Sequence, residues 1–128
     1  MTKNLISVVD DDESIRRTTT FLIESFGFRA AAFESAEVFL KSVQLHDTSC
    51  LLVDVQMPGM NGLELQSELA AAGLSIPIIF ITAFDNKDTR RKAMGAGAVA
   101  FLQKPFSDEK LLQTVRSALT TRESRKST

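Results

Sequence analysis

The chain has 128 residues, of which 44% are hydrophobic and 24% are charged. That length is typical of one domain that buries a hydrophobic core, and the ratio of hydrophobic to charged residues excludes a disordered chain. The formal net charge of -1 gives no sign of a nucleic-acid-binding surface, so we expect any contact with DNA to come from another domain.

Short apolar runs alternate with longer segments of helical spacing, which is typical of parallel βα units and predicts an α/β fold. In chain order we expect a strand at 5–9, a helix at 14–26, a strand at 28–33, a short helix capped by Ser35, a strand at 50–53, a helix at 63–72, a strand at 76–81, a helix at 87–94, a strand at 98–102 and a helix at 107–119. The predicted domain covers residues 1–120. Residues 121–128 are polar and aperiodic, and are interpreted as a tail or as the start of a linker to an absent effector domain.

Polar side chains follow four of the predicted strands. Asp10 and Asp11 follow the first strand, Asp54 the third, Thr82 the fourth and Lys104 the fifth. Ligands of an open parallel sheet bind outside the carboxyl ends of its strands. We therefore expect these side chains to gather at one rim of the sheet.

Crowded carboxylates repel one another, and a hard divalent cation removes that repulsion. Mg²⁺ takes oxygen ligands, with Mn²⁺ as an alternative, whereas the single histidine, His46, argues against zinc. With the cation in place, an aspartate can attack phosphorus and form an acyl phosphate. Lys104 and Thr82 offer a positive charge and a hydrogen-bond donor for the phosphoryl oxygens. Asp12 is instead interpreted as the N-cap of the first helix.

The location is predicted from what the sequence lacks. The first residues hold no cationic segment followed by a long apolar stretch, and no apolar run approaches the roughly 18 residues that a membrane helix needs. Cys50 is the only cysteine, which excludes an intrachain disulfide and fits a reducing compartment. We expect a cytoplasmic protein without membrane contact.

The motifs around the polar residues resemble the receiver domains of bacterial two-component response regulators, over residues 5–119. These motifs are VVDDD at 8–12, DVQMPGMNG at 54–62, ITA at 81–83 and GAVAFLQKPF at 97–106. The resemblance implies a flavodoxin-like, doubly wound (βα)5 three-layer sandwich with the parallel strand order 2-1-3-4-5. The segments SAEVFL at 35–40 and KPF at 104–106 look closest to FixJ-type receivers, which normally precede a helix-turn-helix DNA-binding domain.

The same resemblance assigns roles to residues of this chain. It implies that Asp54 accepts a phosphoryl group from a sensor histidine kinase, and that the peptide bond between Lys104 and Pro105 is cis. The implied Mg²⁺ ligands are Asp10, Asp11, Asp54 and the backbone carbonyl of Gln56, and the implied phosphate contacts are Thr82 and Lys104. A phosphoacceptor signalling domain, which promotes its own phosphorylation and dephosphorylation, is expected rather than an enzyme.

A switch is implied as well. Thr82 would move toward the phosphoryl group, and Phe101 would turn inward, changing the face built from the fourth helix, the fifth strand and the fifth helix. That face would control an output, expected to be transcription, and could support a phosphorylation-dependent homodimer. Without the resemblance, Phe101 would be interpreted as a core residue, because an aromatic residue in a short apolar strand is usually buried. Gln56 and Phe84 flank the expected acyl phosphate, and a bulky Phe84 would screen it from water.

Three alternatives stay open at this point. A phosphatase of the haloacid-dehalogenase type also uses Mg²⁺ and an aspartyl phosphate, but its nucleophile would be Asp10. A flavin carrier shares the fold, although three carboxylates after the first strand would repel its phosphate. A receiver-like module could also bind partners without phosphorylation.

Overall fold

Five parallel strands form one sheet in the computed structural model, which describes residues 3–126. The strands are β1 (Leu5–Val9), β2 (Arg29–Phe33), β3 (Thr48–Asp54), β4 (Ile78–Thr82) and β5 (Ala100–Gln103). Their order in the sheet is β2-β1-β3-β4-β5. The predicted fold class and the strand order 2-1-3-4-5 are therefore confirmed, with strand bounds shifted by a few residues.

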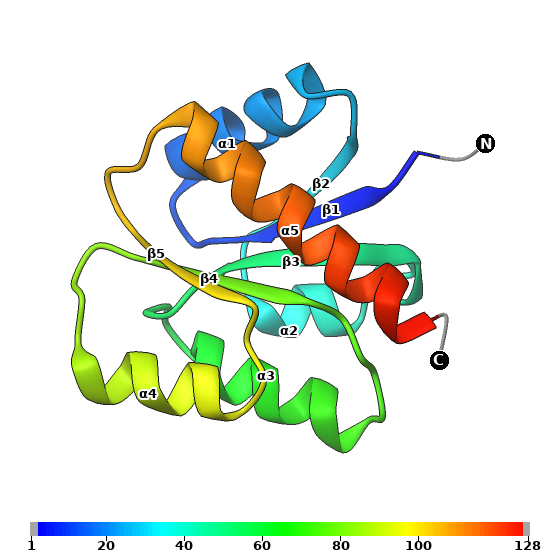
Figure 1. Ribbon diagram of the computed structural model, residues 1–128. Helices are drawn as coiled ribbons and strands as arrows, with labels where there is room; N and C mark the ends of the chain where they lie inside the picture. Colours follow the sequence, from blue (N-terminus) through cyan, green and yellow to red (C-terminus); the bar gives the residue numbers. More distant parts are fainter. Residues whose placement is uncertain (1–2, 127–128) are drawn as a thin grey trace.

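Helices cover both faces of the sheet. They are α1 (Glu13–Ser25), α2 (Ala36–Leu40), α3 (Gly62–Ala71), α4 (Lys87–Gly95) and α5 (Asp108–Lys126), with a short 3-10 helix η1 (Leu45–Asp47) that the sequence did not predict. Figure 1 shows α1 and α5 on one face and α2, α3 and α4 on the other. Between residues 3 and 126, no helix has the length and apolar character needed to cross a membrane.

The central strand β3 explains why the sheet is buried on both faces. Leu51 and Val53 pack into the cluster beneath α2, α3 and α4, whereas Cys50 and Leu52 pack into the cluster beneath α1 and α5. A near-continuous apolar run is what a parallel strand with helices on both faces requires. Each fully buried side chain of this size stabilises the fold by roughly 1.5–3 kcal/mol.

Side-chain caps fix the starts of the helices that follow the strand ends. Asp12 accepts a hydrogen bond from the backbone N–H of Ile15 at 3.1 Å, which confirms its predicted N-cap role. Asn61 and Glu64 form a reciprocal capping box at the start of α3. Each cap satisfies backbone donors that the first helical turn leaves unpaired, and so holds the loop before it in place.

The last helix runs further than the sequence predicted. An end at about residue 119 was expected, but α5 continues to Lys126. The hydroxyls of Thr120 and Thr121 donate to carbonyl oxygens one turn back, at 3.0 and 3.1 Å. The apolar spacing stops near Leu119, which packs into the core, while the helical backbone continues beyond it, so the loss of periodicity did not mark the end of this helix. Residues 127–128 of the expected tail lie outside the described residues.

Helix α5 also sets the direction in which the chain leaves the sheet. It begins beyond the carboxyl end of β5 and runs back past the strands, so that its last turn lies at the opposite side of the molecule from the strand ends (Figure 1).

Candidate functional site

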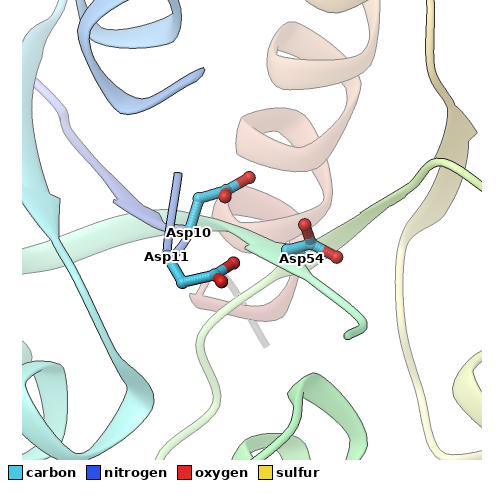
Figure 2. A group of neighbouring side chains, drawn as sticks. All are labelled: Asp10, Asp11 and Asp54. Atoms are coloured by element: carbon cyan, nitrogen blue, oxygen red, sulfur yellow. The ribbon is translucent and has the colours of Figure 1, made fainter. Parts of the chain in front are cut away.

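Three carboxylates meet at the carboxyl ends of two neighbouring strands. Asp10 and Asp11 directly follow β1, and Asp54 is the last residue of β3. One oxygen from each carboxylate lies within 4.8 Å of the others. Figure 2 shows the three side chains near one another, with those of Asp10 and Asp11 extending toward the side on which Asp54 lies. The expected gathering of these aspartates at one rim is therefore present in the fold.

Asp10 is the most deeply buried of the three, with 3% of its surface exposed. Its Oδ1 accepts from the backbone N–H of Asp12 at 2.9 Å, and its Oδ2 accepts from Lys104 at 3.3 Å. Burial raises the pKa of Asp10, and the charge of Asp54 adds to that rise, while the Asp12 N–H and Lys104 oppose it. A nearby cation therefore favours the ionised form of this carboxyl.

Lys104 bridges the two strand ends. Its Nζ lies 3.2 Å from Oδ2 of Asp54 and 3.3 Å from Oδ2 of Asp10. Burial lowers the pKa of Lys104, but the charges of Asp10 and Asp54 outweigh burial, and the net pKa is raised. The side chain is thus held as an ammonium group. The peptide bond from Lys104 to Pro105 is cis, as the resemblance implied.

The Lys104 ammonium group contacts two of the three carboxylates, so its single positive charge does not balance the negative charge of the cluster. Hard divalent cations take carboxylate oxygens, and Mg²⁺ commonly uses only one or two of them together with water. The donor set of Asp10, Asp11 and Asp54 therefore fits Mg²⁺. The carbonyl of Gln56 stays a predicted ligand, since the observed contact of this residue is its N–H, which donates to Asp54 Oδ1 at 2.9 Å.

The loop after Asp54 passes so close to the strand that only glycine fits at its end. A Cβ at Gly62 would lie 2.7 Å from the carbonyl oxygen of Asp54 and 3.0 Å from the ring of Phe80. The N–H of Gly62 donates to the carbonyl of Val55 at 3.0 Å. Gly62 thus ties the start of α3 to the backbone that carries Asp54. The sequence indicated only a loop glycine here.

Thr82 ends β4 beside this cluster, with 2% of its surface exposed. Its hydroxyl donates to the carbonyl of Phe84 at 2.9 Å and accepts from the Phe84 N–H at 3.1 Å. The hydroxyl is therefore engaged with its own loop rather than with a carboxylate. Its predicted role as a phosphate contact would require it to give up the bond that it donates to the Phe84 carbonyl.

Phe101 lies on β5 and is half-buried. Its ring is tilted against that of Phe80, with centroids 6.3 Å apart, and Phe80 is its partner in the pairing of β4 with β5. The predicted switch residues Thr82 and Phe101 thus lie on adjacent strands. Their motion stays a prediction.

Arg16 is a supporting residue that sequence reasoning missed. From α1 it donates through Nη1 to the backbone carbonyl of Asp10 at 2.7 Å. The contact holds the turn that presents Asp10 and Asp11. An arginine one turn into an exposed helix carries no sequence signal for such a role.

A partly apolar groove opens beside Lys104. Its volume is about 350 Å³, and its lining includes Ile15 and Leu22 of α1 together with Pro105 and Phe106. Lys104 belongs to the lining of this groove, so the groove adjoins the acidic cluster.

Comparisons with known proteins agree with one another. A family model described as the response regulator receiver domain matches residues 6–116. Nodulation protein W of Bradyrhizobium diazoefficiens is 47% identical over 117 residues, which are 91% of this chain and 52% of that protein. The transcriptional regulatory protein FixJ of the same organism is 37% identical over 118 residues, which are 92% of this chain and 58% of that protein.

Solved structures give the same result. The response regulator StyR superposes with a TM-score of 0.90 at 40% identity, over 98% of this chain and 64% of that one. The crystal structure of FixJ-N superposes with a TM-score of 0.84 at 34% identity, over 94% of this chain and 96% of that one. The chain spans about half the length of the curated relatives it matches.

Proposed function

The chain belongs to the response regulator receiver family of two-component signalling domains, and from that premise we propose that its Asp54 accepts a phosphoryl group from a sensor histidine kinase. One observation carries the proposal. The Lys104 ammonium group contacts both the half-buried Asp54 carboxylate and the buried Asp10 carboxylate, so positive charge already lies where phosphoryl oxygens would arrive. Family membership also sets aside the flavin carrier and the haloacid-dehalogenase phosphatase.

In the proposed reaction a carboxylate oxygen of Asp54 forms a bond to phosphorus. The bond between phosphorus and the histidine nitrogen of the kinase breaks, and its electron pair leaves with that nitrogen. Transfer of this kind depends on position and charge neutralisation more than on acid or base chemistry. Asp54 suits the role because its Oδ1 is already oriented by the Gln56 N–H.

Mg²⁺ would be held by Asp10, Asp11 and Asp54, together with the carbonyl of Gln56, and Mn²⁺ could take its place. When bound, the cation supplies positive charge that reduces repulsion between the carboxylates and an incoming phosphoryl group. Lys104 would contact one phosphoryl oxygen. Thr82 would exchange the bond that it donates to the Phe84 carbonyl for a bond to another phosphoryl oxygen.

The groove between α1 and Pro105–Phe106 is a candidate binding site for the kinase. A protein donor must cover the rim around Asp54, and this groove offers apolar contact beside Lys104. We expect the kinase to bury Ile15 and Phe106 while its phosphohistidine approaches Asp54.

The output is proposed to be transcription. Relatives such as FixJ are named as transcriptional regulators and extend beyond the matched region. Phosphorylation would shift the face of α4, β5 and α5, with Thr82 and Phe101 as the switch residues, and could produce a homodimer through α4 and β5. DNA binding would belong to a C-terminal effector domain, and the site of action would be the cytoplasm.

The direct experiment is incubation with phosphoramidate and Mg²⁺, followed by intact mass measurement and mapping of the modified peptide. We expect one added phosphoryl group on Asp54 and none in Asp54→Asn. Chelation of Mg²⁺ should abolish the modification. Modification of Asp10 instead, or equal modification in chelator, would overturn the proposal. A chain that stays unmodified yet binds its kinase would be a phosphorylation-independent module.

A matched pair of variants tests the metal ligands. Asp11→Asn removes one carboxylate of the cluster, whereas Asp12→Asn keeps the oxygen that caps α1 and lies outside the cluster. We expect the Mg²⁺ concentration for half-maximal modification to rise at least about tenfold in Asp11→Asn, because one charge has been removed at short range. Asp12→Asn should resemble the parent, and an equal rise in both variants would refute this ligand set.

A further inference from the structure

Arg90 on α4 lies over the ring of Phe101, which is half-buried. The guanidinium carbon of Arg90 lies 5.2 Å from the centroid of the Phe101 ring. The ring also packs against Phe80, with centroids 6.3 Å apart. A guanidinium at this distance from an aromatic face is held by the charge distribution of the ring. Phe101 therefore contacts both a buried aromatic residue and a cation.

The same guanidinium is anchored in the loop before α4. Its Nε donates to Oδ1 of Asp85 at 3.3 Å, and its Nη2 donates to Oδ2 at 3.0 Å. Two parallel bonds to one carboxylate fix the plane of an arginine better than a single contact does. Asp85 thus decides where the Arg90 side chain lies over Phe101.

Asp85 is in turn tied to Thr82 through one residue. The Thr82 hydroxyl bonds to both the N–H and the carbonyl of Phe84, which precedes Asp85. If the hydroxyl turns to donate to a phosphoryl group on Asp54, its hydrogen bond to the Phe84 carbonyl must break, because a hydroxyl has a single proton to donate. The loop then loses a contact that holds Phe84, and with it Asp85, in place. The contacts thus run from Thr82 to Asp85, to Arg90 and to Phe101.

We propose that Arg90 is a positioning residue that holds Phe101 in its unphosphorylated position, and that the Asp85–Arg90 pair makes release of Phe101 depend on Thr82. The inference rests on the proposed function for one step, the movement of Thr82 toward a phosphoryl group. It assigns the coupling to an arginine whose side chain is 47% exposed. An exposed ion pair stabilises one conformation only weakly, so a modest free energy from phosphorylation is enough to break it.

The neighbouring arginine provides the matched control. Arg91 lies on the same helix, its side chain is 80% exposed, and its contact with Asp88 is long at 3.9 Å. Arg90→Gln and Arg91→Gln therefore remove the same charge from the same element. Only the first removes the cover of Phe101.

The first measurement uses the unmodified protein with ring-labelled phenylalanine, observed by NMR and assigned with Phe101→Leu. We expect the Phe101 ring signal to shift in Arg90→Gln and in Asp85→Asn, and to stay at the parental position in Arg91→Gln. A Phe101 signal that responds equally to Arg90→Gln and Arg91→Gln would overturn the contact between Arg90 and Phe101. This measurement needs no phosphorylation, so it does not depend on the proposed function.

The second measurement is a titration with beryllofluoride, a phosphoryl mimic, in the presence of Mg²⁺. Without the contact between Arg90 and Phe101, the beryllofluoride concentration for half-saturation should be roughly three- to tenfold lower in Arg90→Gln than in the parent. Arg91→Gln should match the parent. In a double-mutant cycle with Asp85→Asn, the two effects should not add, because both remove one unit. Additive effects, or an unchanged midpoint in Arg90→Gln, would refute the coupling. A parent that does not respond at all would refute the phosphoacceptor function itself.

Discussion

Gly62 approaches Asp54 so closely that a methyl group at Gly62 would lie 2.7 Å from the Asp54 carbonyl oxygen. The neighbours on this side are backbone atoms and a buried ring, and they cannot swing away as the end of a flexible side chain can. The start of α3 can therefore lie this close to the end of β3 only because Gly62 has no side chain.

Gly62→Ala should accordingly lower the free energy of unfolding by roughly 1–3 kcal/mol, as overpacking in a filled core does. Gly95→Ala is the matched control, since Gly95 is exposed in α4 and an added Cβ would meet no atom within 4 Å. That change should stabilise the protein by about 0.5–1 kcal/mol. Urea unfolding of both variants gives the comparison, and equal effects would contradict the close approach at Gly62.

Lys104→Met should slow phosphorylation of Asp54 by roughly ten- to a hundredfold, because a charge-assisted contact to the reacting group is lost. Mg²⁺ should bind at least as tightly as in the parent, since a competing positive charge has been removed from Asp10 and Asp54. Lys87→Met, at an exposed position of α4, is the control and should leave both quantities unchanged. Weaker Mg²⁺ binding in Lys104→Met would show that the lysine holds the carboxylates in place rather than competing for them.

Phe84→Ala should speed the loss of the phosphoryl group, if the large side chain beside Thr82 screens Asp54 from water. Phe21→Ala is a well-matched control, because Phe21 lies on α1 and its exposure of 69% equals that of Phe84 within one per cent. The decay of the phosphorylated species, followed by intact mass after removal of donor, compares the two. The same lifetime in Phe84→Ala and the parent would exclude screening.

Cys50 should make the protein less stable at high pH. Burial raises the pKa of its thiol from 9.0 to about 12. Below pH 9 the thiol is neutral in both the folded and the unfolded protein, so it does not reduce the free energy of unfolding. Above pH 9 the thiol of the unfolded chain ionises first, and the free energy of unfolding falls until the folded thiol also titrates. At about pH 10 the loss should be roughly 1.4 kcal/mol. Urea unfolding of the parent and Cys50→Ala at about pH 8 and about pH 10 isolates this effect, and equal pH slopes would contradict it.

The sequence predicted the fold and the rim of the site better than it predicted local contacts. Apolar runs revealed the strands because both faces of a parallel sheet are covered, and the positions of Asp10, Asp54 and Lys104 at strand ends were enough to bring them together. The strand order came from the motif resemblance, since periodicity does not encode which strands are neighbours.

Contacts formed through space escaped prediction. Nothing in the pattern around Thr82 indicated that its hydroxyl is bonded twice to Phe84, because such a turn depends on loop conformation. The end of α5 was missed because the apolar spacing of its buried stretch stops near Leu119, while the helical backbone continues to Lys126. The place of Arg90 over Phe101 was missed because it joins two elements through side chains alone.

The course of α5 has a practical consequence. Its 19 residues carry the backbone roughly 28 Å from the carboxyl ends of the strands toward the other side of the molecule. An affinity tag placed after this helix, or an attachment to a solid surface through it, therefore projects away from Asp54. Protein immobilised in this way should leave its acidic rim open to a kinase in solution, which makes this orientation the suitable one for measuring the encounter.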